Sequence, residues 1–112
     1  MKYKIEKNTV QETLIIPLFA RKVCSELYPA LYRDETAVRL INEIDYDFSE
    51  AEKNSRGLMQ RFGSLEVAMR QNDLAFEVRD YLKDHPHAAV VNLGCGLDST
   101  GRSCDNGSCK IY

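Results

Sequence analysis

The sequence has no long hydrophobic run and no sustained run of basic residues. The apolar stretch at residues 14–20 contains Pro17 and is followed by Arg21 and Lys22. It is too short to span a bilayer and lacks the small-residue cleavage pattern of a signal peptide, so we expect a cytoplasmic chain with no membrane partner. The 15 Lys and Arg against 17 Asp and Glu give a net charge of −2, which does not favour a nucleic-acid partner.

The sequence also contains no C-x-x-C pair, although it has four cysteines: Cys24, Cys95, Cys104 and Cys109. Without a secretory signal we expect reduced thiols, and the cysteine spacing fits no zinc-binding pattern. His85 and His87 flank Pro86 and could in principle add imidazoles to a thiolate site. The alternative is that this H-P-H stretch is a polar turn between a helix and a strand.

Three places in the first half of the chain have the residues that start helices. Thr9 with Glu12, and Ser49 with Glu52, have the form of capping boxes, in which a hydroxyl and a carboxylate satisfy the free amides of a first turn. Asp34 is placed to cap a short helix ending at about residue 44. The chain therefore begins as a helical region.

Pro17 is expected to interrupt the first of these helices. Proline lacks a backbone N–H and its ring clashes with the preceding turn, so we predict that Pro17 begins a second helical piece over about residues 18–27. Tyr28-Pro29 is expected to close that piece.

Apolar residues at three- and four-residue spacing predict the buried helix faces. The helix after Asp34 has a stripe of Ala37, Val38, Leu40, Ile41 and Ile44. Ser64 is expected to cap the longest helix, which runs to about Lys83 and has Leu65, Ala68, Met69, Leu74, Ala75, Phe76, Val78, Tyr81 and Leu82 along its apolar surface. We interpret both sets as core.

A glycine-bearing loop follows the last helix. Residues 88–93 form a short apolar run typical of a buried parallel strand, and the run ends in Gly94-Cys95-Gly96. Glycine permits positive φ and close approach of a ligand, and ligands of open α/β sheets bind beyond the carboxyl ends of strands. The third glycine of a dinucleotide fingerprint would fall at Ser99, so that type of phosphate site is disfavoured. From these residues alone, a cofactor loop and a plain tight turn both stay open.

Three stretches resemble one enzyme family. V-V-N-L-G-C-G-L-D-S-T, residues 90–100, resembles the first motif of S-adenosylmethionine-dependent methyltransferases, in the form found in the leucine carboxyl methyltransferase family and its polyketide-type O-methyltransferase relatives. Residues 17–37 resemble the N-terminal element of that family, and M-R-Q-N-D-L around Arg70 resembles the helix before its first strand. The resemblance implies an α/β fold: N-terminal helices, then the first one or two strands of a Rossmann-like class I methyltransferase sheet. Residues 1–56 would form a helical cap on the substrate side, and residues 57–112 the start of the cofactor-binding domain.

The resemblance also implies a set of residues that bind S-adenosylmethionine. Arg21 and Arg70 would pair with the carboxylate of its methionine part, a role that suits the planar guanidinium fork. Lys22 competes with Arg21 for this role, and a salt bridge to Asp73 is the structural alternative for Arg70. The loop residues that would contact the cofactor are Gly94, Cys95, Gly96 and Asp98.

The sequence departs from the family pattern at two places. Cys95 stands where alanine is commoner, and Ser99-Thr100 replaces the more frequent Thr-Arg. Arg102, two residues further on, is the nearest arginine downstream. The usual arginine of this motif is therefore absent from its position in this sequence.

Residues 110–112 resemble the start of a second strand, so we expect an N-terminal portion of a longer methyltransferase that is inactive by itself. The expected acceptor is an oxygen of a small molecule, with a protein C-terminal carboxylate as the alternative, and no residue can be named as catalytic. A rival hypothesis is a non-catalytic helical domain that self-associates, because a two-stranded sheet leaves unpaired edges.

Overall fold

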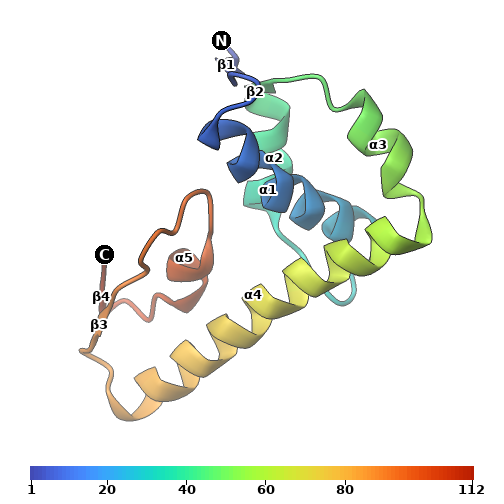
Figure 1. Cartoon of the computed structure of the whole chain (residues 1–112). Coiled ribbons are helices and arrows are strands. Elements are labelled where there is room, and N and C mark those ends of the chain that lie inside the picture. Colours follow the sequence, from blue (N-terminus) through green and yellow to red (C-terminus); the bar gives the residue numbers. More distant parts are fainter. The chain divides into compact units, whose positions relative to one another are not determined.

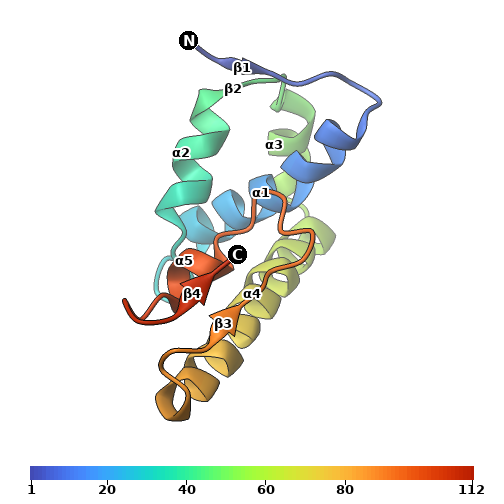
Figure 2. The ribbon, with the colours of Figure 1, turned by 90° about the vertical axis from the view of Figure 1, so that its left-hand side faces the viewer.

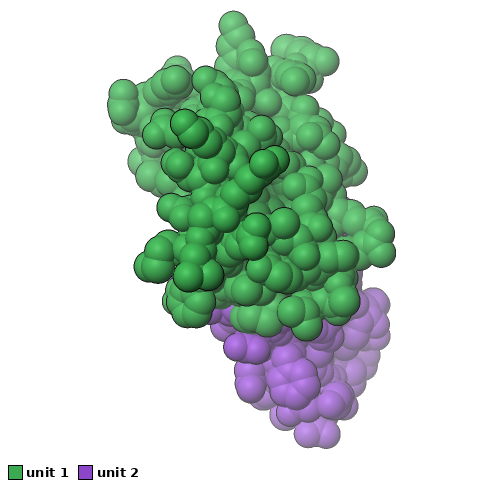
Figure 3. All heavy atoms as spheres, turned by 90° about the vertical axis from the view of Figure 1, so that its right-hand side faces the viewer, with its two compact units in different colours: residues 1–69 green, residues 70–112 purple.

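A computed structural model describes all 112 residues and divides them into two compact units, residues 1–69 and residues 70–112 (Figure 3). In chain order the elements are β1 (Tyr3–Lys4), α1 (Val10–Leu27), α2 (Glu35–Glu43), β2 (Ile44–Asp45), α3 (Ser49–Ser55), α4 (Leu58–Asp84), β3 (Ala89–Val90), α5 (Thr100–Cys104) and β4 (Lys110–Ile111) (Figure 1). Helices and short parallel strand pairs make this an α/β arrangement. The boundary between the units falls within α4. No helix in the chain combines the length and the apolar character that a bilayer span requires.

Helix α1 is continuous through Pro17, so the predicted break at this residue is wrong. A proline inside a helix costs about 3 kcal/mol because one backbone hydrogen bond is lost and the ring meets the preceding turn. Pro17 is exposed, whereas Ile15, Leu18 and Phe19 beside it are buried. Burial of these side chains offsets the cost and keeps one helix, which ends before Tyr28 as predicted.

The two predicted capping boxes mark helix starts correctly but use different hydrogen bonds. Helix α1 begins directly after Thr9, whose hydroxyl donates to the Glu6 carbonyl at 2.7 Å instead of accepting from the helix. Glu12 does reach back, and its carboxylate accepts from the Asn8 amide at 2.7 Å. Helix α3 begins at Ser49, whose amide donates to the Asp47 carboxylate at 3.0 Å.

Helix α2 is capped by Asp34 as predicted. The Asp34 carboxylate accepts from the Ala37 amide at 2.9 Å, and the helix ends before Ile44. Ala37, Ile41 and Ile44 are buried, which confirms the predicted inner face. Ile44 then enters β2, which pairs in parallel with β1 near the N-terminus.

Helix α4 begins at Leu58, six residues before the predicted cap at Ser64. The Ser64 hydroxyl donates to the Arg61 carbonyl at 2.9 Å, a back-bond that allows serine inside a helix. The buried residues of its predicted apolar surface are Ala68, Ala75 and Leu82. Three residues predicted as core are instead more than half exposed: Leu74, Phe76 and Tyr81.

The core of the first unit joins α1 to α4. Cys24 of α1, Tyr32 of the following loop and Ala68 of α4 are buried together. Tyr28, Leu65 and Met69 are partly buried against them. Leu65, Ala68 and Met69 of the predicted apolar surface of α4 therefore belong to the core of this unit.

The second unit contains the predicted parallel strand pair. Strands β3 and β4 lie side by side with Ala89 opposite Lys110 and Val90 opposite Ile111 (Figure 2). The pair extends by one residue, because the Asn92 amide donates to the Tyr112 carbonyl at 3.0 Å. The expected burial of residues 88–93 is wrong, since Val91 and Leu93 are 59% and 87% exposed. Two strands alone cannot enclose side chains on both faces of a sheet.

Candidate functional site

The loop after β3 adopts the backbone conformation that its glycines permit. Gly94 has φ 61° and Gly96 has φ 53°, both in the left-handed region that other residues rarely occupy. A Cβ placed on Gly94 would meet no atom within 4 Å. The space beside Gly94 is therefore open, and glycine is needed there for its backbone angle and leaves room for a ligand.

Asp98 holds this loop closed through both of its carboxylate oxygens. Oδ1 accepts from the Thr100 amide at 2.9 Å and from the Thr100 hydroxyl at 2.8 Å. Oδ2 accepts from the Asn92 side-chain amide at 3.1 Å, which ties the end of the strand to the end of the loop. The Asp98 amide in turn donates to the Cys95 carbonyl at 2.8 Å. These contacts make Asp98 a residue that shapes the loop.

Helix α4 supports the far end of the loop within the second unit. The side-chain amide of Gln71 donates to the Ser99 hydroxyl at 2.8 Å. The Cys104 thiol, at the end of α5, lies 3.5 Å from the Ala75 carbonyl. Arg70 directly precedes Gln71 and is exposed. Its role in binding a cofactor carboxylate stays a prediction.

The cysteines are all free, and they differ in environment. Cys95 is exposed in the loop and Cys109 is partly exposed. Burial raises the pKa of the Cys24 and Cys104 thiols. No group of three or more His, Cys, Asp and Glu side chains is gathered as a metal site would require.

The H-P-H stretch lies between α4 and β3, as the turn interpretation predicted. His85 stacks on Tyr81 with ring centroids 4.2 Å apart and an interplanar angle of 10°. Asn106, which precedes β4, anchors this turn, since its side-chain amide donates to the Pro86 carbonyl at 3.0 Å.

Arg21 is buried in the first unit, next to Asp34. A guanidinium nitrogen of Arg21 lies 3.6 Å from the Asp34 carboxylate, and both side chains are at least nine-tenths buried. The Tyr32 hydroxyl donates to the same carboxylate oxygen at 3.0 Å. Burial, followed by the charge of Asp34, raises the pKa of Tyr32 well above its usual range, so this hydroxyl remains a donor. Arg21 is thus a fixed, partly neutralised cation.

Lys22, the competitor of Arg21, occupies a different environment. Its ammonium lies 3.3 Å from the Glu26 carboxylate and 5.5 Å from the centre of the Phe19 ring. Arg21 is therefore buried beside Asp34, whereas Lys22 interacts with Glu26 and Phe19 of its own helix. Which of the two meets a cofactor carboxylate stays a prediction.

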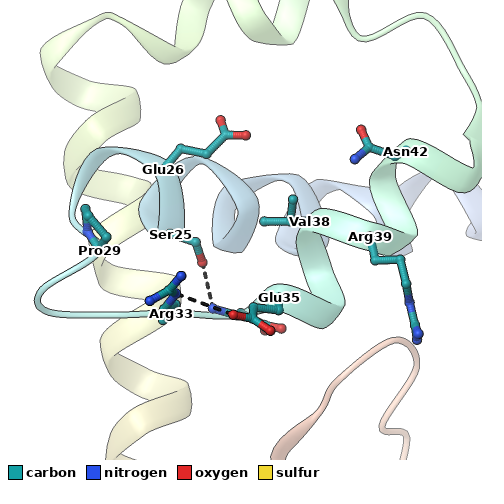
Figure 4. A pocket seen from close by; sticks show the side chains of 9 residues that line it. Ser25, Glu26, Pro29, Arg33, Glu35, Val38, Arg39 and Asn42 are labelled. Atoms are coloured by element: carbon teal, nitrogen blue, oxygen red, sulfur yellow. Dashed lines mark hydrogen bonds and ion pairs between the residues drawn. The ribbon is translucent and has the colours of Figure 1, made fainter.

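A pocket of about 540 Å³ opens beside Asp34 in the first unit. Its lining residues are Ser25, Glu26, Pro29, Arg33, Asp34, Glu35, Val38, Arg39 and Asn42 (Figure 4). The Ser25 hydroxyl accepts from the Asp34 amide at 2.9 Å, and Arg33 lies 3.5 Å from Glu35. Charges of both signs line the pocket, and within the lining Arg33 pairs with Glu35.

Sequence reasoning did not assign roles to Asn92, Gln71 or Tyr32. Of the three, the role of Asn92 is the easiest to predict from the sequence, because a polar residue at the carboxyl end of a strand is placed to interact with the loop that follows. The contacts of Gln71 and Tyr32 depend on segments that meet only in the folded chain.

Comparison with known proteins gives one informative similarity. Over 95 residues the chain is 34% identical to the tetracenomycin polyketide synthesis O-methyltransferase TcmP of Streptomyces glaucescens. The match covers 85% of this chain and 33% of that protein, so the chain spans about a third of the length of the relative. No known family profile and no solved structure matches the chain.

Proposed function

We propose that this chain supplies the first cofactor-binding part of an S-adenosylmethionine-dependent O-methyltransferase. The observation that carries the proposal is the loop after β3, in which Gly94 and Gly96 take positive φ and Asp98 holds the ends together. The similarity to the O-methyltransferase of Streptomyces glaucescens supports the same reaction class. A Rossmann-like sheet would place this loop at the carboxyl end of its first strand.

The residues present fit such a cofactor. The open space beside Gly94 admits close approach to the backbone, and the neighbouring Cys95 and Gly96 are exposed. Arg70 offers a guanidinium to a carboxylate, and Arg21 or Lys22 is the proposed second cation. Asp98 acts by shaping the loop, since both of its oxygens are engaged there. S-adenosylmethionine, when bound, supplies an electrophilic methyl group on a sulfonium sulfur.

The acceptor is proposed to be an oxygen of a small molecule. Transfer to a hydroxyl requires loss of its proton, whereas a carboxylate acceptor needs no base. No residue of this chain is assigned as that base. The contribution of the enzyme is then mainly to hold the acceptor oxygen and the methyl group in line.

Calorimetric titration with S-adenosylhomocysteine tests the proposal. We expect saturable binding, weakened about tenfold or more in Arg70→Ala, because one charge-assisted contact to a carboxylate is worth roughly 1.5–3 kcal/mol. Arg61→Ala is the matched control, since Arg61 is an exposed arginine of the same helix in the other unit. Absence of binding to the folded chain, or equal weakening in both variants, would contradict the proposal.

A self-associating domain is the second candidate, and exposed apolar side chains favour it. In the second unit these are Leu74, Phe76, Tyr81, Val91, Leu93, Ile111 and Tyr112. A strand pair with open edges can also pair with a second copy. Light scattering over a dilution series tests this candidate: a mass that falls on dilution supports association, and a monomer at every concentration counts against it.

A further inference from the structure

The turn between α5 and β4, residues 105–109, has the sequence D-N-G-S-C and lies outside the candidate cofactor loop. Its first four residues are exposed, so water reaches the turn and a small product can leave it. Asn106 is followed by Gly107, which has no Cβ to hinder the approach of its backbone nitrogen to the asparagine side chain. The sequence therefore places an unhindered backbone nitrogen directly after an asparagine amide.

The side chain of Asn106 is held by hydrogen bonds at both of its polar atoms. Its Oδ1 accepts from the Ser108 amide at 2.9 Å and from the Cys109 amide at 2.7 Å. Its Nδ2 donates to the Pro86 carbonyl at 3.0 Å. Two backbone N–H groups at these distances stabilise negative charge that develops on a carbonyl oxygen, as the donors of an oxyanion hole do. The side-chain carbonyl of Asn106 is thus polarised for attack by a nucleophile.

Asp105 brings a carboxylate to the backbone nitrogen of Gly107. The Asp105 Oδ1 accepts from the Gly107 amide at 2.8 Å. A carboxylate at hydrogen-bond distance from an N–H group is placed to take its proton while the nitrogen forms a new bond. Nucleophile, base and oxyanion donors are held in one turn, which lowers the entropic cost of bringing them together.

We propose that Asn106 and Gly107 form a self-modifying site, at which the Asn106 amide is converted to a carboxylate without an enzyme or a cofactor. The Gly107 nitrogen forms a bond to the Asn106 Cγ and gives its proton to Asp105. The bond between Cγ and Nδ2 breaks, and Nδ2 takes that proton and leaves as ammonia. Water then opens the cyclic imide: opening at Cγ leaves aspartate, and opening at the backbone carbonyl leaves isoaspartate. No electrons are transferred.

The conversion removes the hydrogen bond that anchors the turn before β3. A carboxylate has no hydrogen to donate to the Pro86 carbonyl, and isoaspartate also lengthens the backbone in the turn that leads into β4. The strand pair depends on the Lys110 amide, which donates to the Ala88 carbonyl at 3.1 Å, and on the Tyr112 amide, which donates to the Val90 carbonyl at 2.9 Å. We expect these bonds to open more often after the conversion. The inference goes beyond the proposed function and does not rest on it.

The experiment incubates the full chain at neutral pH and follows the turn by mass spectrometry of proteolytic peptides, with chromatography to separate aspartate from isoaspartate. We expect conversion at Asn106 in the folded chain, and a rate about tenfold or more lower in Asp105→Ala, because the base is lost. Asp73→Ala, which removes an exposed aspartate of α4 in the same unit, should react as the wild type does. Asn54 should remain unmodified, because it lies in α3 and is followed by a serine with a Cβ.

Two further measurements separate the effect of the fold from that of the sequence. In guanidinium chloride the hydrogen bonds around the Asn106 side chain are lost, so conversion should be slower than in the native chain. Hydrogen exchange of the Lys110 and Tyr112 amides should be faster in Asn106→Asp than in the wild type, and unchanged in the control Asn54→Asp.

The inference would be overturned by an unmodified Asn106 in the folded chain, by equal rates in Asp105→Ala and wild type, or by faster conversion in denaturant. Unchanged hydrogen exchange in Asn106→Asp would overturn the expected effect on the strand pair. Asp105 is exposed, so Asp105→Ala should fold, and thermal unfolding of this variant checks that its rate is measured on the folded chain.

Discussion

The side-chain amide of Asn92 donates to the carboxylate of Asp98 at 3.1 Å and so joins the end of β3 to the end of the glycine loop. The other carboxylate oxygen of Asp98 accepts two hydrogen bonds from Thr100, at the start of α5. Strand, loop and helix thus meet at one side chain. The shape of the candidate cofactor loop depends on this carboxylate more than on any other group in it.

Removing that carboxylate should therefore weaken cofactor binding. In Asp98→Ala we expect S-adenosylhomocysteine binding to weaken by more than about tenfold, a change of over 1.4 kcal/mol. Asn92→Ala removes one of the three side-chain contacts and should weaken binding less. Calorimetry on both variants shows which one binds S-adenosylhomocysteine more weakly. A larger effect from Asn92→Ala would show that the loop is held in another way.

Substitutions of Gly94 should reduce stability through the backbone conformation of this residue and not through crowding of its side chain. Gly94→Ala places a Cβ in open space but in a left-handed conformation, so we expect a loss of about 1–2 kcal/mol of stability. Gly94→Asn should cost less, because asparagine adopts this region more readily. Urea unfolding measures both. Equal stability of Gly94→Ala and wild type would mean that the loop changes its conformation at no cost.

Asp34 should be among the most important residues for the stability of the first unit. Asp34→Ala leaves Arg21 buried without this partner, and breaking a buried pair costs about 3–5 kcal/mol. Asp34→Asn keeps an acceptor for the Ala37 amide, and asparagine is a good helix cap. This variant should therefore lose less stability than Asp34→Ala. Urea unfolding of the wild type and both variants separates the contribution of the Asp34 charge to stability from that of the helix cap. If the two variants are equally stable, the cap contributes nothing, and if Asp34→Asn is as stable as the wild type, the ion pair contributes nothing.

Pro17 should be a destabilising residue that the surrounding core outweighs. Pro17→Ala restores a helical N–H at an exposed position and should raise stability by on the order of 1–3 kcal/mol. Thermal unfolding tests this change. A lower melting temperature would indicate that the proline ring makes a contact on which the helix depends.

Local signals predicted the starts of α1, α2 and α3, including the Asp34 cap, because these depend on residues three or four positions apart, whereas α4 begins at Leu58 and not after Ser64. The continuity of α1 could not be predicted in the same way, since burial of Ile15, Leu18 and Phe19 decides it. The β1–β2 pair also has no local pattern, because each strand has two residues and they lie far apart in sequence.

The candidate site was predictable to a similar extent. The loop glycines and the parallel pairing of residues 110–112 followed from the motif and its resemblance. The partners of Arg21 and Asp98 did not follow from the motif, because they depend on how loops fold onto helices. The exposed Leu93 shows the limit of apolar patterning, which predicts a buried strand whether or not a second layer covers it.

The most direct test of the account is the rate at which Cys95 reacts with a thiol reagent in the presence and absence of S-adenosylhomocysteine. Cys95 is exposed in the loop, and Cys109 in the same unit is an internal reference. Cys24 and Cys104 should react slowly, because both are buried and their pKa values are raised. We expect the compound to slow modification of Cys95, to leave Cys109 unchanged and to lose its effect in Arg70→Ala. Equal rates for Cys95 with and without a saturating concentration would contradict the assignment of this loop as the cofactor site.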